Sequence, residues 1–118
     1  MPIAVHPGVV LTRASVLDVV TCAQAQFEAG AKVFHFGAPL DLPAALGKVP
    51  KDIVLCGNLD PAGVFCQSTP EEVRERTGDL LHATRDFPNF IISSGCDVPA
   101  AAPFDNLVAF YEAVAAQA

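Results

Sequence analysis

The chain lacks any long apolar run, because no stretch approaches the roughly 18 residues that a membrane-spanning helix requires. It also lacks a basic N-terminal segment followed by a long apolar one, which would mark a secretory signal. Basic residues are few, with seven Lys and Arg against 13 Asp and Glu and a net charge of −6. Scattered cations on an acidic chain offer no surface for phosphate backbones or anionic lipids. These absences predict a cytoplasmic protein that binds neither membranes nor nucleic acid.

Cysteine pairs at metal-binding spacing are missing as well. The four cysteines, Cys22, Cys56, Cys66 and Cys96, are 34, 10 and 30 residues apart. This spacing matches neither a CxxC metal site nor the dense cysteines of a secreted disulfide scaffold. We therefore expect four reduced thiols.

Charged residues are sparse for a chain of this length. They make up 17% of the 118 residues, compared with about 25% in average soluble domains, whereas 52% of the residues are hydrophobic. A chain of this length forms one domain, 1–118, at most. The excess of apolar residues predicts either a large core or an apolar surface that a partner covers.

What is present is an alternation of strand and helix patterns. Short apolar stretches begin near residues 3, 32, 52 and 89, and each precedes residues with helical spacing. The expected strands are 3–5, 32–36, 52–56 and 90–93, and the expected helices are 15–29, 42–46, 69–85 and a last one from about 104. Thr69, Pro70 and Glu72 form a capping box at the third helix start, and a turn is expected at 57–61. Four strands with crossover helices predict a parallel α/β (βα)4 arrangement.

Two folds are compatible with four βα units. An open flavodoxin-like sheet has helices on both faces, whereas half of a TIM (β/α)8 barrel leaves its inner face uncovered. The residue pattern alone leaves both folds open.

Polar residues gather where the expected strands end. The carboxyl ends of parallel strands meet at one edge, and TIM barrels carry their active sites there. Six residues fall at these ends: His6, His35, Asn58, Asp60, Cys96 and Asp97. Structural alternatives exist, since Asn and Asp side chains form Asx-turns and a free cysteine is often a small buried apolar side chain. A histidine among apolar neighbours, such as His35, is also commonly a hydrogen-bonded core residue.

Three segments together resemble a known family. The segments 57–61, 69–73 and 89–99 are similar to the C-terminal part of the uroporphyrinogen decarboxylase (URO-D) superfamily. The turn Gly95-Cys96-Asp97 resembles the zinc- and corrinoid-dependent methyltransferases of this superfamily, because its decarboxylases have a histidine in the corresponding loop. The resemblance implies that the (βα)4 unit is the C-terminal half of a TIM barrel.

The same resemblance implies a zinc site. In this branch the metal is held by a cysteine and an upstream His-x-Cys pair, which correspond here to Cys96 and to residues 6–8. His6 is present in that segment and the second cysteine is absent. The expected ligands are therefore Cys96 and His6, one short of the three that a catalytic zinc requires. The residues expected near the substrate are His35, Asn58, Asp60 and Asp97.

Three functions follow as expectations. The first is methyl transfer from a corrinoid protein that carries methylcobamide to a zinc-bound thiol, with the chain as a C-terminal fragment or half-barrel subunit that is inactive alone. The second is decarboxylation of a tetrapyrrole of the uroporphyrinogen type. The third is a nonenzymatic remnant or assembly subunit. Because two (βα)4 units can close an eight-stranded barrel, we expect a homodimer or association with a separate N-terminal half.

Overall fold

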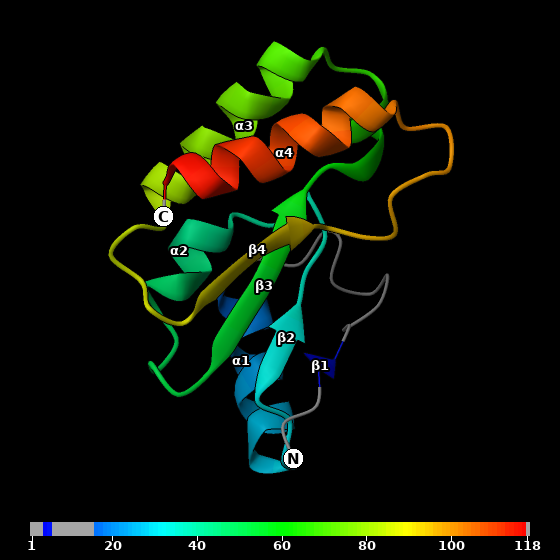
Figure 1. The fold of residues 1–118 in the computed structure, drawn as a ribbon. Helices are drawn as coiled ribbons and strands as arrows, with labels where there is room; N and C mark the ends of the chain where they lie inside the picture. Colours follow the sequence, from blue (N-terminus) through cyan, green and yellow to red (C-terminus); the bar gives the residue numbers. More distant parts are fainter. Residues whose placement is uncertain (1–3, 6–15, 118) are drawn as a thin grey trace.

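The computed structural model describes residues 4–5 and 16–117 (Figure 1). Strands and helices alternate along these residues. In chain order the elements are β1 (Ala4–Val5), α1 (Val16–Glu28), β2 (Val33–His35), α2 (Leu42–Leu46), β3 (Val54–Leu59), η2 (Pro61–Cys66), α3 (Pro70–Ala83), β4 (Phe90–Ser94) and α4 (Phe104–Ala116). Within the described residues, no helix has both the length and the apolar character to cross a bilayer.

The strands form one parallel sheet in the order β1-β2-β3-β4. Phe34 in β2 lies opposite Leu55 in β3, and Leu55 lies opposite Phe90 in β4. A helix lies between each two consecutive strands of the chain, as parallel pairing requires. The predicted α/β fold of parallel βα units is therefore confirmed, and its sheet is open within the described residues.

The strand order separates the two folds that the residue pattern left open. A flavodoxin-like sheet has the order 2-1-3-4-5 with helices on both faces, whereas a barrel keeps its strands in chain order. Here the order is sequential, and both clusters of buried apolar residues include strand residues from the same face of the sheet. The arrangement is compatible with half of a TIM barrel and differs from a doubly wound sheet.

One face of the sheet forms the main core. Side chains alternate between the two faces of a strand, and Phe34 and Leu55 on this face are 0% exposed. They pack against α1 and α2, which lie behind the sheet in Figure 1. The buried members of this cluster are Ala23, Phe34, Phe36, Leu42, Ala45, Leu46, Ile53 and Leu55. Removing this apolar surface from water is the main stabilising contribution to the fold.

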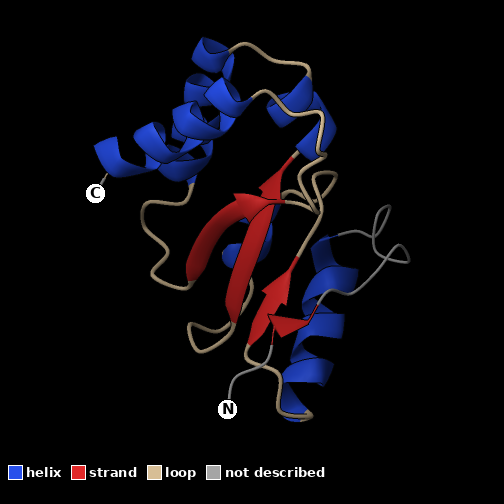
Figure 2. Cartoon of the chain, turned by 45° about the vertical axis from the view of Figure 1, so that its right-hand side comes forward, coloured by secondary structure: helices blue, strands red, loops and turns tan. Residues whose placement is uncertain are grey.

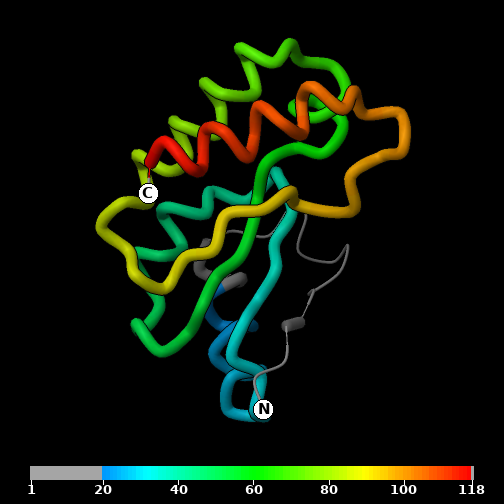
Figure 3. The backbone as a smooth tube through the Cα atoms, in the orientation of Figure 1, coloured from blue at the N-terminus to red at the C-terminus, as the bar shows by residue number. Residues whose placement is uncertain are grey.

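The helices α3 and α4 pack side by side and form a second cluster with η2 (Figure 3). Phe65 of η2 contacts Phe110 of α4, with ring centroids 5.5 Å apart. Asn106 is buried in α4, and its Nδ2 donates to the carbonyls of Phe65 at 2.9 Å and Ser68 at 2.8 Å. The last helix thus satisfies backbone carbonyls 41 and 38 residues earlier in the chain.

The opposite face of the sheet has none of the described helices packed on it (Figure 2). This uncovered face carries the alternate strand residues Val33, His35, Val54, Cys56, Ile91 and Ser93. None of these six is fully buried, and Ile91 is 49% exposed. In a closed barrel, this face would line the interior.

The third strand is longer than the sequence predicts. β3 runs to Leu59, so Gly57 and Asn58 continue the strand, and the turn predicted at 57–61 is wrong. Gly57 has a φ of +148°, and a Cβ at this position would lie 2.6 Å from the carbonyl oxygen of Phe36. Only glycine fits against the chain that leaves β2, so the residue that suggested a turn is required for close strand packing.

Residues 61–66 form the short π-helix η2, which the sequence pattern does not predict. The other helix predictions agree more closely with the structure. The helix α2 has the predicted bounds, and α3 begins as expected. The Thr69 hydroxyl accepts a hydrogen bond from the Glu72 amide at 3.3 Å, which confirms the predicted N-cap.

Candidate functional site

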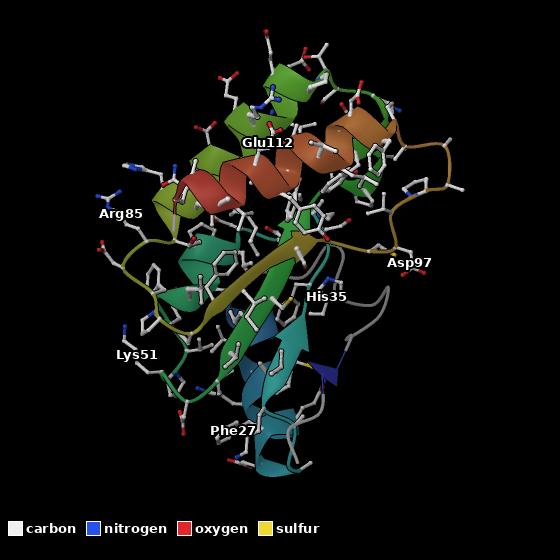
Figure 4. The ribbon with its side chains drawn as sticks, in the orientation of Figure 1. Phe27, His35, Lys51, Arg85, Asp97 and Glu112 are labelled. Carbon is white, nitrogen blue, oxygen red and sulfur yellow. The ribbon has the colours of Figure 1, made fainter. Side chains whose placement is uncertain are left out.

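The carboxyl ends of β2, β3 and β4 lie next to one another, because the three strands are parallel neighbours. The residues predicted at strand exits therefore gather at one edge of the sheet. Figure 4 shows His35 at the end of β2 and Asp97, which is exposed, on the segment that follows β4. The predicted ligand His6 lies outside the described residues.

His35 joins the end of β2 to the end of β4. Its Nε2 is 2.7 Å from the carbonyl oxygen of Ser94 and 3.2 Å from the hydroxyl oxygen of Ser93. Because a carbonyl oxygen only accepts hydrogen bonds, Nε2 carries the proton of the shorter contact. The half-buried imidazole therefore reaches across β3 and binds the backbone two residues before Cys96.

Ser93 extends this contact to β3. Its hydroxyl donates to the Ser94 carbonyl at 2.8 Å, and its oxygen lies 3.3 Å from the Cys56 thiol. His35, Ser93 and Cys56 thus form a polar strip across three strands on the uncovered face. Sequence reasoning missed Ser93, although the alternation of β4 places it on the same face as Ile91.

Asn58 and Asp60 both bind backbone groups, Asn58 those of a distant segment and Asp60 one two residues away. The Nδ2 of Asn58 donates to the carbonyls of Gly37 at 3.1 Å and Leu40 at 2.6 Å, and the residue is buried. A carboxylate oxygen of Asp60 accepts from the Ala62 amide at 3.1 Å and caps η2. These bonds give both residues a structural role, because Asn58 holds the connection between β2 and α2 in place. Their contact with a substrate stays a prediction.

Cys96 lies on an exposed turn directly after β4. The backbone before it is fixed, since the Gly95 amide donates to the Leu59 carbonyl at 2.7 Å. A Cβ on Gly95 would lie 2.8 Å from the backbone nitrogen of Ala38. The segments that leave β2 and β4 therefore pack backbone against backbone, and the thiol is presented just beyond this contact.

The described residues do not assemble a zinc centre by themselves. Among residues 4–5 and 16–117, no three His, Cys, Asp or Glu side chains are grouped so that they could hold a metal ion. The Nε2 of His35 is a donor to Ser94, and Cys56 contacts Ser93. Cys96 is available as one ligand, whereas a catalytic zinc requires three. A zinc site that includes this chain needs ligands from outside the described residues.

These features define an α/β protein with the strand order of a βα-barrel and a thiol at its strand exits. The model of the uroporphyrinogen decarboxylase (URO-D) family matches residues 17–117, and the chain therefore belongs to this family. The match extends over α1 to α4 and so includes the exits of β2, β3 and β4. No curated protein matches the chain.

Proposed function

We propose that the chain is the C-terminal half-barrel of a methyltransferase-like member of this family. The observation that carries the proposal is the exposed Cys96 thiol directly after β4, at the edge where βα-barrels bind their substrates. A thiolate is a strong zinc ligand, whereas the decarboxylases that the chain resembles have a histidine in this loop. The turn therefore favours methyl transfer over tetrapyrrole decarboxylation and over a remnant without a site.

In this proposal the methyl group comes from a methylated corrinoid protein and is transferred to a thiol. Cys96 and His6 are the proposed zinc ligands, and His35 and Asp97 lie near the substrate. Because Cys96 and His6 are two of the three protein ligands that a catalytic zinc requires, the proposal includes that the chain alone is inactive. Activity requires a polypeptide that completes both the metal site and the barrel.

The proposed completing polypeptide is a second copy of the chain. Among residues 20–117, the exposed large hydrophobic side chains lie on the last βα unit: Ile91, Val98, Phe104, Val108 and Tyr111. Phe104, Val108 and Tyr111 follow one another at spacings of four and three residues and so line one side of α4. Phe104 is 75% exposed and Tyr111 is 70% exposed. An apolar stripe of this kind marks an interaction surface.

The other edge of the sheet supports a second copy as the occupant. There, α1 exposes the small side chains of Thr21 and Ala25, which share one side of the helix because they are one turn apart. A two-fold axis along the barrel would bring the β4 edge of each copy against the β1 edge of the other. The large side chains of α4 in one copy would then contact the small side chains of α1 in the other copy. The eight strands of the two copies would form a closed barrel.

Metal binding tests the role of Cys96. We expect the purified chain to bind Co²⁺, used as a spectroscopic substitute for zinc, weakly and with a thiolate-to-metal absorption band. Cys96→Ala removes the band, whereas the control Cys66→Ala, at the end of η2, keeps it. Tight, stoichiometric binding that Cys96→Ala leaves undiminished would overturn the assignment. Decarboxylation of uroporphyrinogen by the chain would replace it.

Sedimentation equilibrium at micromolar concentration tests the partner. We expect the chain to have the mass of a dimer, and the double substitution Phe104→Ser with Tyr111→Ser to yield the monomer mass. The control Glu75→Ser changes another exposed helical residue, on α3, and leaves the dimer intact. A monodisperse wild-type monomer would contradict the second-copy proposal and leave a separate N-terminal half as the partner.

A further inference from the structure

We propose that His35 is a positioning residue that fixes the Cys96 thiol by holding the Ser94 carbonyl. The inference deepens the proposed function, on which it rests in taking Cys96 as the group that must be placed. The contact between Nε2 and the carbonyl oxygen is 2.7 Å, a short hydrogen bond. It links β2 to β4, which are not neighbours in the sheet.

The backbone before Cys96 is held from two directions. His35 binds the Ser94 carbonyl from β2, and the Leu59 carbonyl accepts the Gly95 amide from β3 at 2.7 Å. A Cβ on Gly95 would lie 2.8 Å from the Ala38 nitrogen, so the turn packs closely against the chain that leaves β2. Loss of the imidazole therefore removes one of the bonds that decide where the thiol lies.

The same geometry distinguishes a positioning residue from a metal ligand. The proton on Nε2 occupies the electron pair that a metal would need, so His35 does not ligate a metal through this nitrogen while it binds Ser94.

Two substitutions at position 35 separate hydrogen bonding from space filling. A glutamine at position 35 places an amide N–H near the same point and can donate to the same carbonyl. A leucine fills a similar space and cannot donate. The Ser93 hydroxyl oxygen also lies 3.2 Å from Nε2, and the Cys56 thiol contacts Ser93 in turn.

Two measurements on His35→Gln and His35→Leu test the proposal. The first is hydrogen exchange of the Gly95 amide, which reports opening of the turn, and the second is the affinity of the chain for Co²⁺ through Cys96. We expect His35→Leu to raise the exchange rate and to weaken Co²⁺ binding about fivefold each, the factor that corresponds to about 1 kcal/mol for one hydrogen bond. His35→Gln restores both quantities to near wild type. His82→Leu, on the exposed side of α3, is the control and changes neither.

Each outcome decides the proposal. Loss of Co²⁺ binding in His35→Gln with slow Gly95 exchange would make His35 a ligand and overturn the positioning role. Equal Gly95 exchange in all variants would overturn it as well. Absence of Co²⁺ binding in the wild type would defeat the proposed function, while Gly95 exchange still decides what His35 does. If His35→Leu does not fold, His35→Asn, whose amide is too short to reach Ser94, takes its place with the same expected exchange.

Discussion

The helix-covered face of the sheet and the uncovered face are built from alternate residues of the same strands, yet they differ in burial and in the polar side chains at the strand exits. Phe34 and Leu55 are fully buried under α1 and α2, whereas their chain neighbours His35 and Cys56 are half-buried and hydrogen-bonded to other strands. One face therefore stabilises the chain by removing apolar surface from water. The other face places polar groups at the strand exits, where they can meet a substrate or a partner.

Because the two faces differ in this way, substitutions on them are expected to affect stability and binding separately. A substitution on the covered face changes the free energy of unfolding, because it removes packed atoms. A substitution on the uncovered face changes binding first, provided that the face is open in solution. Pairs of similar substitutions test this difference. In each pair, one substitution is made at a tightly packed position and the other at a more open position.

The largest effect is expected for Leu55→Ala, on the covered face. Leu55 is 0% exposed, so its truncation leaves a cavity and lowers the free energy of unfolding by about 2–5 kcal/mol. Val54→Ala, one residue earlier on the half-buried uncovered face, lowers it by about 1 kcal/mol. Urea denaturation of both variants measures the difference. Equal losses would mean that the uncovered face is covered in solution, and a concentration dependence of the Val54→Ala loss would identify a second copy as the cover.

A smaller effect is expected for a glycine pair. A Cβ on Gly95 would lie 2.8 Å from the Ala38 nitrogen and 3.0 Å from the Gly37 Cα. Gly95→Ala therefore forces the exits of β2 and β4 apart and lowers the free energy of unfolding by about 1–3 kcal/mol. Gly78→Ala, in open space on α3, raises it by about 0.5–1 kcal/mol, because alanine favours the helix. Thermal unfolding of both variants gives the two signs, and a neutral Gly95→Ala would contradict the tight contact at the exits.

The smallest effect is expected for the ion pair between α3 and α4. Arg74 and Glu112 are joined at 2.9 Å, but their side chains are 46% and 55% exposed. Water screens such a pair, so the coupling in a double-mutant cycle of Arg74→Ala and Glu112→Ala is about 0.2–1 kcal/mol. Denaturation at low and high salt measures it. A coupling above this range would show that the two helices depend on charge more than on the apolar cluster to which Val73 of α3 and Phe110 of α4 belong.

Much of the fold could be predicted because local signals and tertiary structure agree. Thr69, Pro70 and Glu72 specify a helix start whatever lies around them, and α3 begins there. The apolar run from Ile53 to Cys56 predicts a strand, and β3 includes it from Val54 on, but its lack of alternation predicts cover on both faces, whereas Val54 and Cys56 are only half-buried. The end of this strand could not be predicted, because Gly57 and Asn58 have the residue types of a turn. Their positions are instead decided by the chain that leaves β2, which comes close only in the folded molecule.

The candidate site could be located from the sequence but not assembled. The turn that carries Cys96 after β4 is predictable, because the preceding residues have the pattern of a strand and Gly95 ends it. The contact from His35 to Ser94 joins residues 59 positions apart, and no local pattern reports such a distance. Ser93 was missed for the same reason, since its partners lie on β2 and β3.

The buried Asn106 has a consequence for how the chain is made. Its amide supplies the hydrogen bonds for the carbonyls of Phe65 and Ser68, which precede it by 41 and 38 residues. During translation those carbonyls emerge from the ribosome long before their donor. The segment between β3 and α3 therefore reaches its final hydrogen bonding only after Asn106 has been added to the chain. A protease that cuts the chain between 97 and 103 would separate this segment from α4, which supplies the donor.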